Sequence, residues 1–457
     1  MDTFRINEKD NVCVNLETGH KIALCDIEKG ADIIKYGYPI GYATENIAEG
    51  DTVHSHNMKT KLGDILSYEY SPKFTELKSE EPFYINAYLR ENGDIGIRND
   101  IWIVPTVGCV NSIAKALSEK TGAIAYSHPY GCSQLGGDHK TTQLILRGLI
   151  KHPNAGGVLV LGLGCENNHI GEMKEVLGTW NEKRIRFLSV QDCEDEIAEG
   201  IRIIEELKAL AEKDKRENVS VSKLKIGLKC GGSDGFSGIT ANAVAGKVTD
   251  RICAMGGTAV LTEVPEMFGA ETVLFERCIN EDIWNKSVKL INDFKQYFKD
   301  HGEPVSENPS PGNKEGGITT LEEKSLGCVQ KGGTAPVVDV LNYGDTATKP
   351  GLNLLNGPGN DIVSITNLSA AGCHLVLFTT GRGTPLGGAV PTVKIASNDN
   401  IAEKKSHWID YSAYGFDRKA KADELLEVIR RVADGEPTKN ELLGNREIAI
   451  FKDGVTL

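Results

Sequence analysis

Hydrophobic and polar positions follow two different patterns along this chain of 457 residues. Over residues 1–72, short apolar runs such as Asn11–Leu16 and Pro39–Ala43 are separated by turn signals such as Glu17-Thr18-Gly19. This pattern predicts a small β-rich module. Residues 73–84 are mostly polar and contain a proline, which is typical of a linker between domains.

Beyond the linker, strand-like apolar runs alternate with segments of helical spacing. Four such runs each precede a helical pattern: 101–110, 122–131, 156–165 and 185–192. A strand followed by a helix, repeated four times, predicts a parallel sheet covered by helices. We therefore expect a first α/β domain over residues 85–220. The same pattern, with strands such as 224–234 and 374–383, predicts a second α/β domain over residues 221–457.

The composition excludes several classes of function. The chain is 40% hydrophobic and 25% charged, as an ordinary globular protein is. Its net charge of −13, from 51 basic and 64 acidic residues, does not suit nucleic acid or an anionic membrane surface as a partner. The sequence shows neither a membrane-spanning apolar run nor a signal peptide, so we expect a cytoplasmic protein.

The eleven cysteines include no C-x-x-C pair, and a disulfide framework is not expected in a cytoplasmic chain of this length. Four cysteines instead end an apolar strand in a Gly/Cys turn: Cys109, Cys132, Cys165 and Cys230. Open parallel sheets bind ligands at the carboxyl ends of their strands. We expect Cys132, Cys165 and Cys230 to bind a metal, because thiolates favour iron, zinc and iron–sulfur clusters. The alternative is that small residues simply fit tight turns.

Histidines occur at two places that suit chemistry. His128 precedes Cys132 by four residues in the same predicted turn, and we take it as the candidate catalytic base. His54 and His56 fall on one side of an expected extended strand, because side chains alternate with a period of two. There they can bind a metal or a carboxylate; the alternative is an exposed polar strand edge.

Two loops carry cations that suit an anionic ligand. Residues 303–317 are rich in Pro, Gly and Asn, which predicts a long loop that presents Asn313 and Lys314. Arg382 lies between glycines at a strand end, where its guanidinium can bind a carboxylate or form an ordinary salt bridge. Ser233 and Asp234, which follow Cys230, are further candidates for substrate binding. No P-loop and no convincing dinucleotide fingerprint occurs.

These segments resemble the altronate/galactarate dehydratase family, whose relatives include sulfolactate sulfo-lyase. The matching segments span nearly the whole chain in the family's order: His54–Asn57, Asp94–Asn99, Pro105–Asn111, Gly162–Glu166, Lys229–Asn242, Asn308–Gly317 and Phe378–Gly383. The run Lys229–Asn242 is the most specific of them. Ser133 stands where several relatives are expected to have glycine, which leaves the identity of the sugar acid open.

The resemblance implies an α/β protein with an N-terminal β-clip module of the SAF type and a large, Rossmann-like parallel catalytic region. It also implies a homodimer and a requirement for iron, as mononuclear Fe²⁺ or as an iron–sulfur cluster, with Mn²⁺ as a substitute metal. The expected reaction is the dehydration of a sugar acid to a 2-keto-3-deoxy acid. D-altronate is the first candidate substrate, and galactarate or another aldonate or aldarate is the second.

In this interpretation, iron bound by the three cysteines stabilises the charge that develops when the α-proton leaves. His128 takes that proton, Lys314 and Arg382 bind the carboxylate, and His54 and His56 close over the site. Two other hypotheses stay open. One is cleavage of a C–S bond, as in the sulfolactate relatives, whose two parts are usually separate subunits. The other is a sugar-acid binding or sensing protein without turnover.

Overall fold

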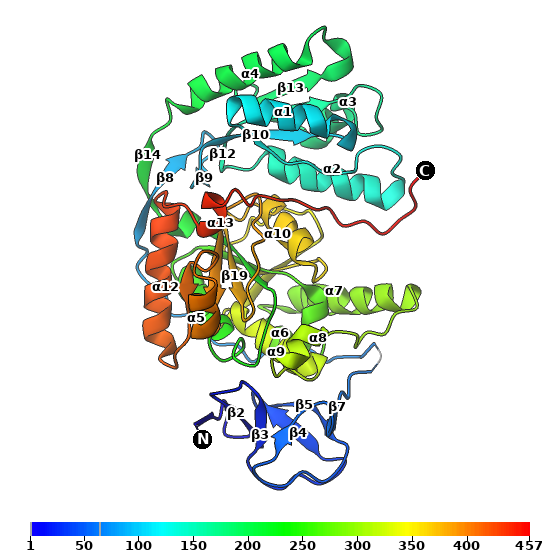
Figure 1. Cartoon of the computed structure of the whole chain (residues 1–457), viewed down its shortest axis with the longest axis vertical. Helices are drawn as coiled ribbons and strands as arrows, with labels where there is room; N and C mark the ends of the chain where they lie inside the picture. The colour runs from blue at the N-terminus through cyan, green and yellow to red at the C-terminus, as the bar shows by residue number, and fades with distance from the viewer. Residues whose placement is uncertain (1, 64) are drawn as a thin grey trace.

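The computed structural model describes residues 2–63 and 65–457, and it consists of three parts stacked along one axis. In Figure 1 the small module lies at the bottom, the C-terminal domain in the middle and the second domain at the top. The expected α/β class, with a small β-rich module and a large parallel region, is confirmed. The part that follows the module in sequence thus lies at the far end of the molecule.

The small module is built from two antiparallel sheets, of order β1-β2-β3-β6 and β4-β5-β7. Their bounds are β1 Thr3–Phe4, β2 Val12–Asn15, β3 Lys21–Ala23, β4 Asp32–Lys35, β5 Tyr38–Ala43, β6 Thr52–Val53 and β7 Met58–Lys59. Apolar side chains from both sheets, such as Val12, Ile33 and Ile40, are fully buried in one cluster. This burial explains the short apolar runs, because such strands expose one face and bury the other.

His54 and His56 do not lie on an extended strand, contrary to the expectation. Strand β6 ends at Val53, and residues 54–57 form a turn. The Asn57 side chain accepts a hydrogen bond from the His54 backbone N–H at 2.9 Å, and the Asn57 N–H donates back to the His54 carbonyl at 3.0 Å. Asparagine favours such turns because its short side chain bonds the nearby backbone.

The segment between the module and the second domain, residues 60–83, contains no helix or strand among its described residues. It follows the surface of the C-terminal domain, where the Lys73 N–H donates to the Glu276 carbonyl at 2.7 Å and the Glu80 N–H to the Ala254 carbonyl at 3.1 Å. A linker at this place matches the polar stretch of the sequence, while the domain limits themselves stay a prediction.

The second domain contains a parallel four-stranded sheet of order β11-β10-β12-β13. Its strands are β10 Asp100–Pro105, β11 Ile124–Ala125, β12 Ala155–Gly162 and β13 Ile185–Ser189. Its helices are α1 Asn111–Thr121, α2 Gly136–Ile150, α3 Ile170–Leu177 and α4 Glu196–Ala211. The strand–helix alternation read from the sequence therefore exists. A small sheet, β14-β8-β9, joins this domain to the next, with bounds β8 Tyr84–Leu89, β9 Ile95–Gly96 and β14 Arg216–Ser220.

The second and C-terminal domains share one apolar core. Helix α2 packs on α10 (Asp361–Ala370), and Leu146 and Leu149 belong to the same buried cluster as Ile365 and Leu368. At Gly148 the two backbones approach so closely that a Cβ would lie 2.3 Å from the Ala370 carbonyl oxygen. Only glycine allows this approach.

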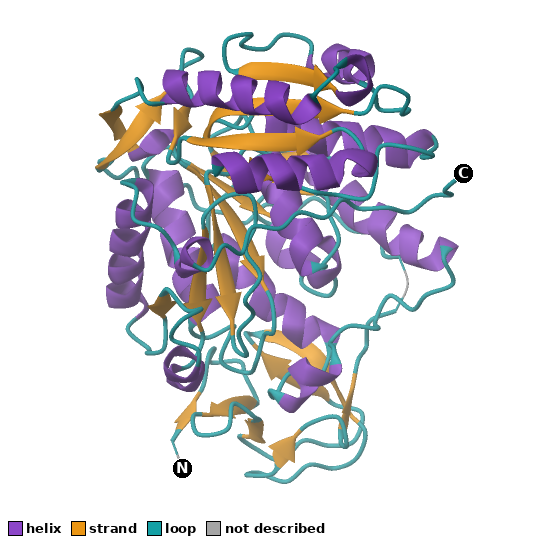
Figure 2. Ribbon diagram, turned by 45° about the horizontal axis from the view of Figure 1, so that its top comes forward, coloured by secondary structure: helices purple, strands orange, loops and turns teal. Residues whose placement is uncertain are grey.

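The C-terminal domain is built on a parallel seven-stranded sheet of order β17-β18-β16-β15-β19-β20-β21, with helices on both faces (Figure 2). Its strands are β15 Lys225–Cys230, β16 Thr258–Leu261, β17 Val337–Leu341, β18 Gly351–Leu355, β19 Leu375–Thr380, β20 Thr392–Ala396 and β21 Tyr411–Ser412. Its other helices are α5 Ala241–Ala254, α6 Glu271–Phe275, α7 Glu281–Asp300, α8 Pro311–Glu315, α9 Leu321–Cys328, α11 Asp399–Lys404, α12 Arg418–Ala433 and α13 Lys439–Leu442. Among the described helices, none is long and apolar enough to cross a membrane.

Buried ion pairs connect the small module to helix α9. The Glu323 carboxylate accepts from Lys21 Nζ at 2.7 Å and from Lys35 Nζ at 2.8 Å, and the three side chains are at most 2% exposed. Lys21 also donates to the Gly317 carbonyl and to Thr319. Burial would by itself raise the pKa of Glu323, but the two lysines outweigh it and lower this pKa to about 2.

We predict that Glu323→Gln destabilises the protein by about 3–5 kcal/mol, because it leaves two buried ammonium groups without their counter-ion. Urea unfolding at pH 7 measures the loss, and limited proteolysis of residues 60–83 reports release of the module. The matched control is Lys61→Gln, which breaks a pair with Asp32 whose side chains are 50% and 40% exposed. We expect the control to cost no more than about 1 kcal/mol. Equal effects of both substitutions would contradict the assigned role of Glu323.

Candidate functional site

The topology of the seven-stranded sheet marks the place of a ligand site. From β15 the chain continues to β16 on one side, and it returns later to β19 on the other side. In open parallel sheets, the crevice at such a switch point, outside the carboxyl ends of the strands, is where ligands bind. The loops that follow β15 and β19 contain Ser233, Asp234 and Arg382, three of the residues expected from the sequence.

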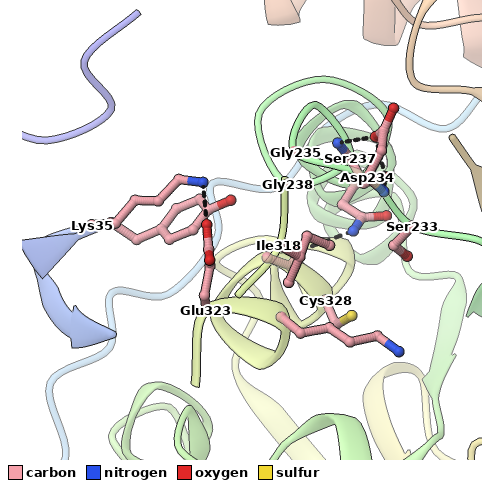
Figure 3. Close-up of a pocket in the computed structure, with 13 residues that line it drawn as sticks. Lys35, Ser233, Asp234, Gly235, Ser237, Gly238, Ile318, Glu323 and Cys328 are labelled. Carbon is pink, nitrogen blue, oxygen red and sulfur yellow. Dashed lines mark hydrogen bonds and ion pairs between the residues drawn. The ribbon is translucent and has the colours of Figure 1, made fainter. Parts of the chain in front are cut away.

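Asp234 joins the loop after β15 to the loop after β20, and Figure 3 shows its contact with Ser237. Its carboxylate accepts from the Ser237 N–H at 2.9 Å, and from Ser397 Oγ and Asn398 Nδ2 at 2.8 Å each. Burial raises the pKa of Asp234, and these hydrogen bonds oppose the rise. A Cβ on Gly381 would lie 2.3 Å from Asp234 Cγ, so glycine is required at the end of β19.

Helix α8 lies inside the segment that was expected to be loop. Pro311 begins it and Ser310 caps it, an arrangement that satisfies free N–H groups at a helix start. Asn313 Nδ2 donates to the Ser233 carbonyl at 2.8 Å, which holds α8 against the β15 loop. Arg382 Nη1 donates to the Gly312 carbonyl and pairs with Glu315, both at 3.1 Å.

The small module brings histidines to the same helix. His54 Nε2 lies 2.9 Å from the Lys314 carbonyl oxygen, and its ring centroid lies 5.3 Å from that of His20. Burial lowers the pKa of His20, and the neighbouring His54 lowers it further, so the imidazole of His20 is neutral at pH 7. The Lys314 and His56 side chains are exposed. His20 was not anticipated, although it follows Gly19 at a turn that the sequence marks.

A polar hollow of about 420 Å³ lies between the small module and the C-terminal domain. The module contributes Leu16, Glu17 and Thr18 to its wall. The C-terminal domain contributes residues from the loops after β15, β19, β20 and β21, among them Asp234, Phe236, Arg382, Asn398, Asp399 and Tyr414. Its size falls within the roughly 300–1,000 Å³ of small-molecule sites.

Two thiols and a carboxylate form a buried group at the end of β15. Cys230, Glu266 and Cys328 bring one potential ligand atom each within 4.8 Å of the others, and no other such group occurs among residues 2–63 and 65–457. The two Sγ atoms are 3.3 Å apart, and Glu266 Oε2 lies 3.2 Å and 3.1 Å from them. The small cavity drawn in Figure 3, of about 10 Å³, is lined by both Cys328 and Asp234, and Asp234 also lines the hollow.

The charges around this group are balanced. Lys331 Nζ lies 2.7 Å from Cys230 Sγ, and Lys324 pairs with Glu266 at 2.8 Å. Lys229 contacts Glu263, and it pairs with Asp361 at 2.8 Å. When both thiols are protonated and neutral, the positive charges of the three lysines equal the negative charges of the three carboxylates. Because a divalent cation replaces two thiol protons, its binding leaves that balance unchanged. The donor set thus fits a thiophilic divalent metal.

The other predicted metal ligands lie elsewhere. Cys132 and Cys165 are exposed on the second domain, after β11 and β12, whereas Cys230 is buried at the end of β15 in the C-terminal domain. The ligand atoms near Cys230 come from Glu266 and Cys328. Glu266 follows β16, the neighbour of β15, so the strand-end rule would have found it; Cys328 ends a helix and gives no such signal.

His128 was expected to be the catalytic base, but in the structure both of its ring nitrogens make contacts with the backbone. It is 2% exposed, its Nε2 bonds the Pro105 carbonyl at 2.8 Å, and its Nδ1 accepts from the Tyr130 N–H at 3.2 Å. Burial lowers the pKa of His128 to about 4. Both ring nitrogens therefore join the ends of β10 and β11, and neither is free to take a proton from a ligand.

Comparison with known proteins agrees with this architecture. Three family models match in order: "Altronate/galactarate dehydratase SAF domain" over residues 3–61, "D-galactarate dehydratase/Altronate hydrolase, second domain" over 87–212, and "D-galactarate/Altronate dehydratase, C-terminal" over 221–456. Together with the relatives below, they identify a lyase that removes water from a sugar acid. The chain belongs to the D-galactarate/altronate dehydratase family.

Three relatives illustrate the degree of similarity. The altronate dehydratase of Bacillus subtilis (strain 168) is 53% identical over 97% of this chain and 93% of its own length. The altronate dehydratase of Escherichia coli (strain K12) is 52% identical over 98% of this chain and 94% of its own length. The galactarate dehydratase (L-threo-forming) of Escherichia coli (strain K12) is 31% identical over 91% of this chain and 84% of its own length.

The sheet below the site contains a buried lysine with an unusual environment. Lys229, Phe378 and Lys394 are register neighbours across β15, β19 and β20. Lys394 Nζ lies 3.5 Å from the Phe378 ring centroid and has no hydrogen-bond partner among the described residues. Burial lowers the pKa of Lys394 to about 7, against the opposing effect of Asp361.

We predict that Lys394 makes the free energy of unfolding rise with pH between about 7 and 10. In that range the unfolded chain holds a proton on this lysine and the folded chain does not, so stability increases as pH increases. Lys394→Met should remove this rise and stabilise the protein at pH 7 by on the order of 2–4 kcal/mol. Urea unfolding across that range tests it, with Lys286→Met on the exposed side of α7 as control. An unchanged slope in the Lys394 variant would refute the prediction.

Proposed function

We propose that this protein is an iron-dependent hydro-lyase that converts D-altronate to a 2-keto-3-deoxy acid. The observation that carries the proposal is the polar hollow at the switch point, where Arg382 lines the wall. The chain is also 52–53% identical to two altronate dehydratases over nearly its full length. The identity to galactarate dehydratase is 31%, which makes galactarate the second candidate. The expected homodimer and cytoplasmic location stay predictions.

Arg382 is our candidate for binding the substrate carboxylate. Its pair with Glu315 is exposed, with side chains 50% and 70% accessible, and exposed pairs contribute little to stability. A substrate carboxylate can therefore displace Glu315 and take two hydrogen bonds from the planar guanidinium. Lys314, exposed on α8, supplies a second positive charge at the same helix.

The reaction removes a proton from the carbon next to the carboxylate and a hydroxide from the following carbon, and together they form water. The enol that results becomes the keto acid. We assign the proton transfers to the pair of His20 and His54, in place of His128. A neutral His20 can accept a proton at pH 7, and the contact of His54 with the Lys314 carbonyl fixes the pair beside α8.

Cys230, Glu266 and Cys328 are the residues that would hold the metal, because they are the compact donor set of the described chain. A bound Fe²⁺ would stabilise the negative charge that develops on the substrate. Asp234 lines both the hollow and the cavity above Cys328, and it keeps the loops between them in a fixed position. Mn²⁺ is an alternative metal for the same donors.

The proposal predicts turnover of one sugar acid in a panel. Iron-loaded protein is assayed without oxygen against altronate, galactarate, galactonate, mannonate and sulfolactate, and the keto acid is quantified with and without a chelator. We expect chelator-sensitive formation of a 2-keto-3-deoxy acid from altronate at a rate well above that from the other acids. Release of sulfite from sulfolactate would instead establish C–S cleavage. Tight binding of an acid without product would establish a binding protein.

A substitution at Arg382 tests the carboxylate site. Arg382→Gln removes the guanidinium but keeps a polar side chain, and we expect it to raise KM for altronate at least about tenfold, the loss of one charge-assisted hydrogen bond. Arg430→Gln is the matched control, because Arg430 makes a similar exposed pair with Glu427 on α12, away from the hollow. If both variants keep the parental KM, Arg382 does not bind the substrate.

A further inference from the structure

The polar hollow between the small module and the C-terminal domain has an uneven set of charges in its wall. Among the described residues that line it, Arg382 is the one cation, whereas Glu17, Asp234 and Asp399 are acidic. Lys314, the other candidate cation, lies on α8 and is not part of this wall. A ligand in the hollow therefore meets one positive group and several negative ones.

Asp234 does not present its charge to a ligand. It is buried, and its two carboxylate oxygens accept hydrogen bonds from the side chains of Ser237, Ser397 and Asn398. Glu17 and Asp399, in contrast, are exposed residues of the wall. The negative charge that a ligand meets in the hollow therefore comes from these two carboxylates.

Asp399 is held close to Arg382 by the sheet. The two residues follow the neighbouring parallel strands β20 and β19. Asn398 Nδ2 donates to the Gly381 carbonyl at 3.1 Å, so Asp399 and Arg382 are each one residue beyond this contact. Asp399 begins α11, and one of its carboxylate oxygens accepts from Ser412 Oγ at 2.8 Å. The other oxygen has no partner among the described residues and is available to a ligand.

Glu17 reaches the hollow from the small module. It belongs to the turn between β2 and β3, where its N–H and that of Thr18 donate to Asn15 Oδ1 at 2.8 Å and 3.2 Å. The turn packs against the loop after β15, where a Cβ on Gly235 would lie 2.0 Å from the Gly19 carbonyl oxygen. The Glu17 carboxylate forms no hydrogen bond or ion pair with another described residue. Its position is thus fixed by the turn, and its charge is not neutralised.

The neutral part of the wall suits the hydroxyl groups of a sugar chain. The Asn400 side chain and the Tyr414 hydroxyl make no hydrogen bond to another described residue. The Tyr414 ring packs edge to face on Phe236, with ring centroids 5.9 Å apart, which restricts its orientation. Amide and phenol groups both donate and accept hydrogen bonds, so they can bind neutral hydroxyls.

The wall charges distinguish a sugar acid with one carboxylate from one with two. An aldonate has a carboxylate at one end and a hydroxymethyl group at the other, whereas an aldarate has a carboxylate at both ends. Arg382 can bind the first carboxylate. A second carboxylate would meet the like charges of Glu17 and Asp399, which disfavour its binding. A hydroxymethyl group instead donates a hydrogen bond to either of them.

We propose that Glu17 and Asp399 are specificity-determining residues, which make the hollow accept a sugar acid with one carboxylate and exclude one with two. The inference rests on the proposed function, because that function places the substrate in the hollow. It adds the groups that separate altronate from galactarate. One of them comes from the small module and the other from the C-terminal domain, so the module takes part in the choice of substrate.

The test compares acids that differ only at the last carbon. D-altronate and D-altrarate form one such pair, and D-galactonate and galactarate form the other. Their dissociation constants are measured at pH 7 by titration calorimetry on full-length protein with a chelator present, so that no turnover takes place. We expect each monoacid to bind at least about tenfold more tightly than its diacid at low salt. Added salt should reduce this ratio, because exposed charges are screened.

Substitutions assign the preference to the two residues. Glu17→Gln and Asp399→Asn remove the charges and keep side chains of similar size that still accept hydrogen bonds. We expect the double variant to improve the affinity for each diacid, relative to its monoacid, at least about tenfold, and each single variant to give part of this change. The matched control is the double variant of Asp282→Asn and Glu427→Gln, two exposed acids on α7 and α12 that do not line the hollow. It should keep the parental ratio, and circular dichroism verifies that each variant is folded.

Three results would overturn the inference. They are a parent protein that binds diacids as tightly as monoacids, a parental ratio in the double variant of Glu17 and Asp399, and binding of neither kind of acid. These measurements do not use the keto acid as a readout. If altronate binds with the expected preference but no keto acid forms in the panel assay, the proposed function fails and the assignment of Glu17 and Asp399 stands.

Discussion

The Glu323 carboxylate is the contact on which the site depends, because it seats the small module against α9 and the module forms one wall of the hollow. One carboxylate meets two lysines there, out of contact with water. Burial lowers the pKa of Lys21 to about 8 against the opposing effect of Glu323, so Lys21 still carries its proton at pH 7 and Glu323 faces two ammonium groups. Buried ion pairs add little net stability, but they tolerate few geometries. Glu323 therefore sets the orientation of the module, and with it the positions of Thr18, His20 and His54.

Much of the fold could be predicted from the sequence, because parallel sheets impose a local rule. A strand buried on both faces reads as a continuous apolar run, and the residues that follow it lie at one edge. This rule identified the four strands of the second domain and placed Ser233, Asp234 and Arg382 after strand ends; that these ends lie at the switch point follows only from the sheet order. It failed at His54 and His56, where Asn57 turns the chain, because period-two spacing cannot distinguish a strand from the turn that ends it.

The partners of Cys230 could not be predicted, because they depend on packing between elements that are distant in sequence. Cys328 is separated from Cys230 by 98 residues, and Glu266 by 36. Three lysines and three carboxylates surround them, so each charge is satisfied by residues of another loop. A strand-end motif shows one ligand of such a group. The whole set of ligands can be recognised only from the packing of β15, β16 and α9 in the structure.

The surroundings of a cysteine decide whether it can act as a metal donor in this chain. At Cys230 and Cys328 the thiols are buried beside lysines, and the hydrogen bond between them, with burial, raises the pKa of Cys328. A metal must displace that proton, and the charge balance then limits it to a divalent ion. On the second domain Cys109, Cys132 and Cys165 are exposed and do not belong to this buried group, so burial and neighbouring charge, rather than residue type, distinguish the metal donors.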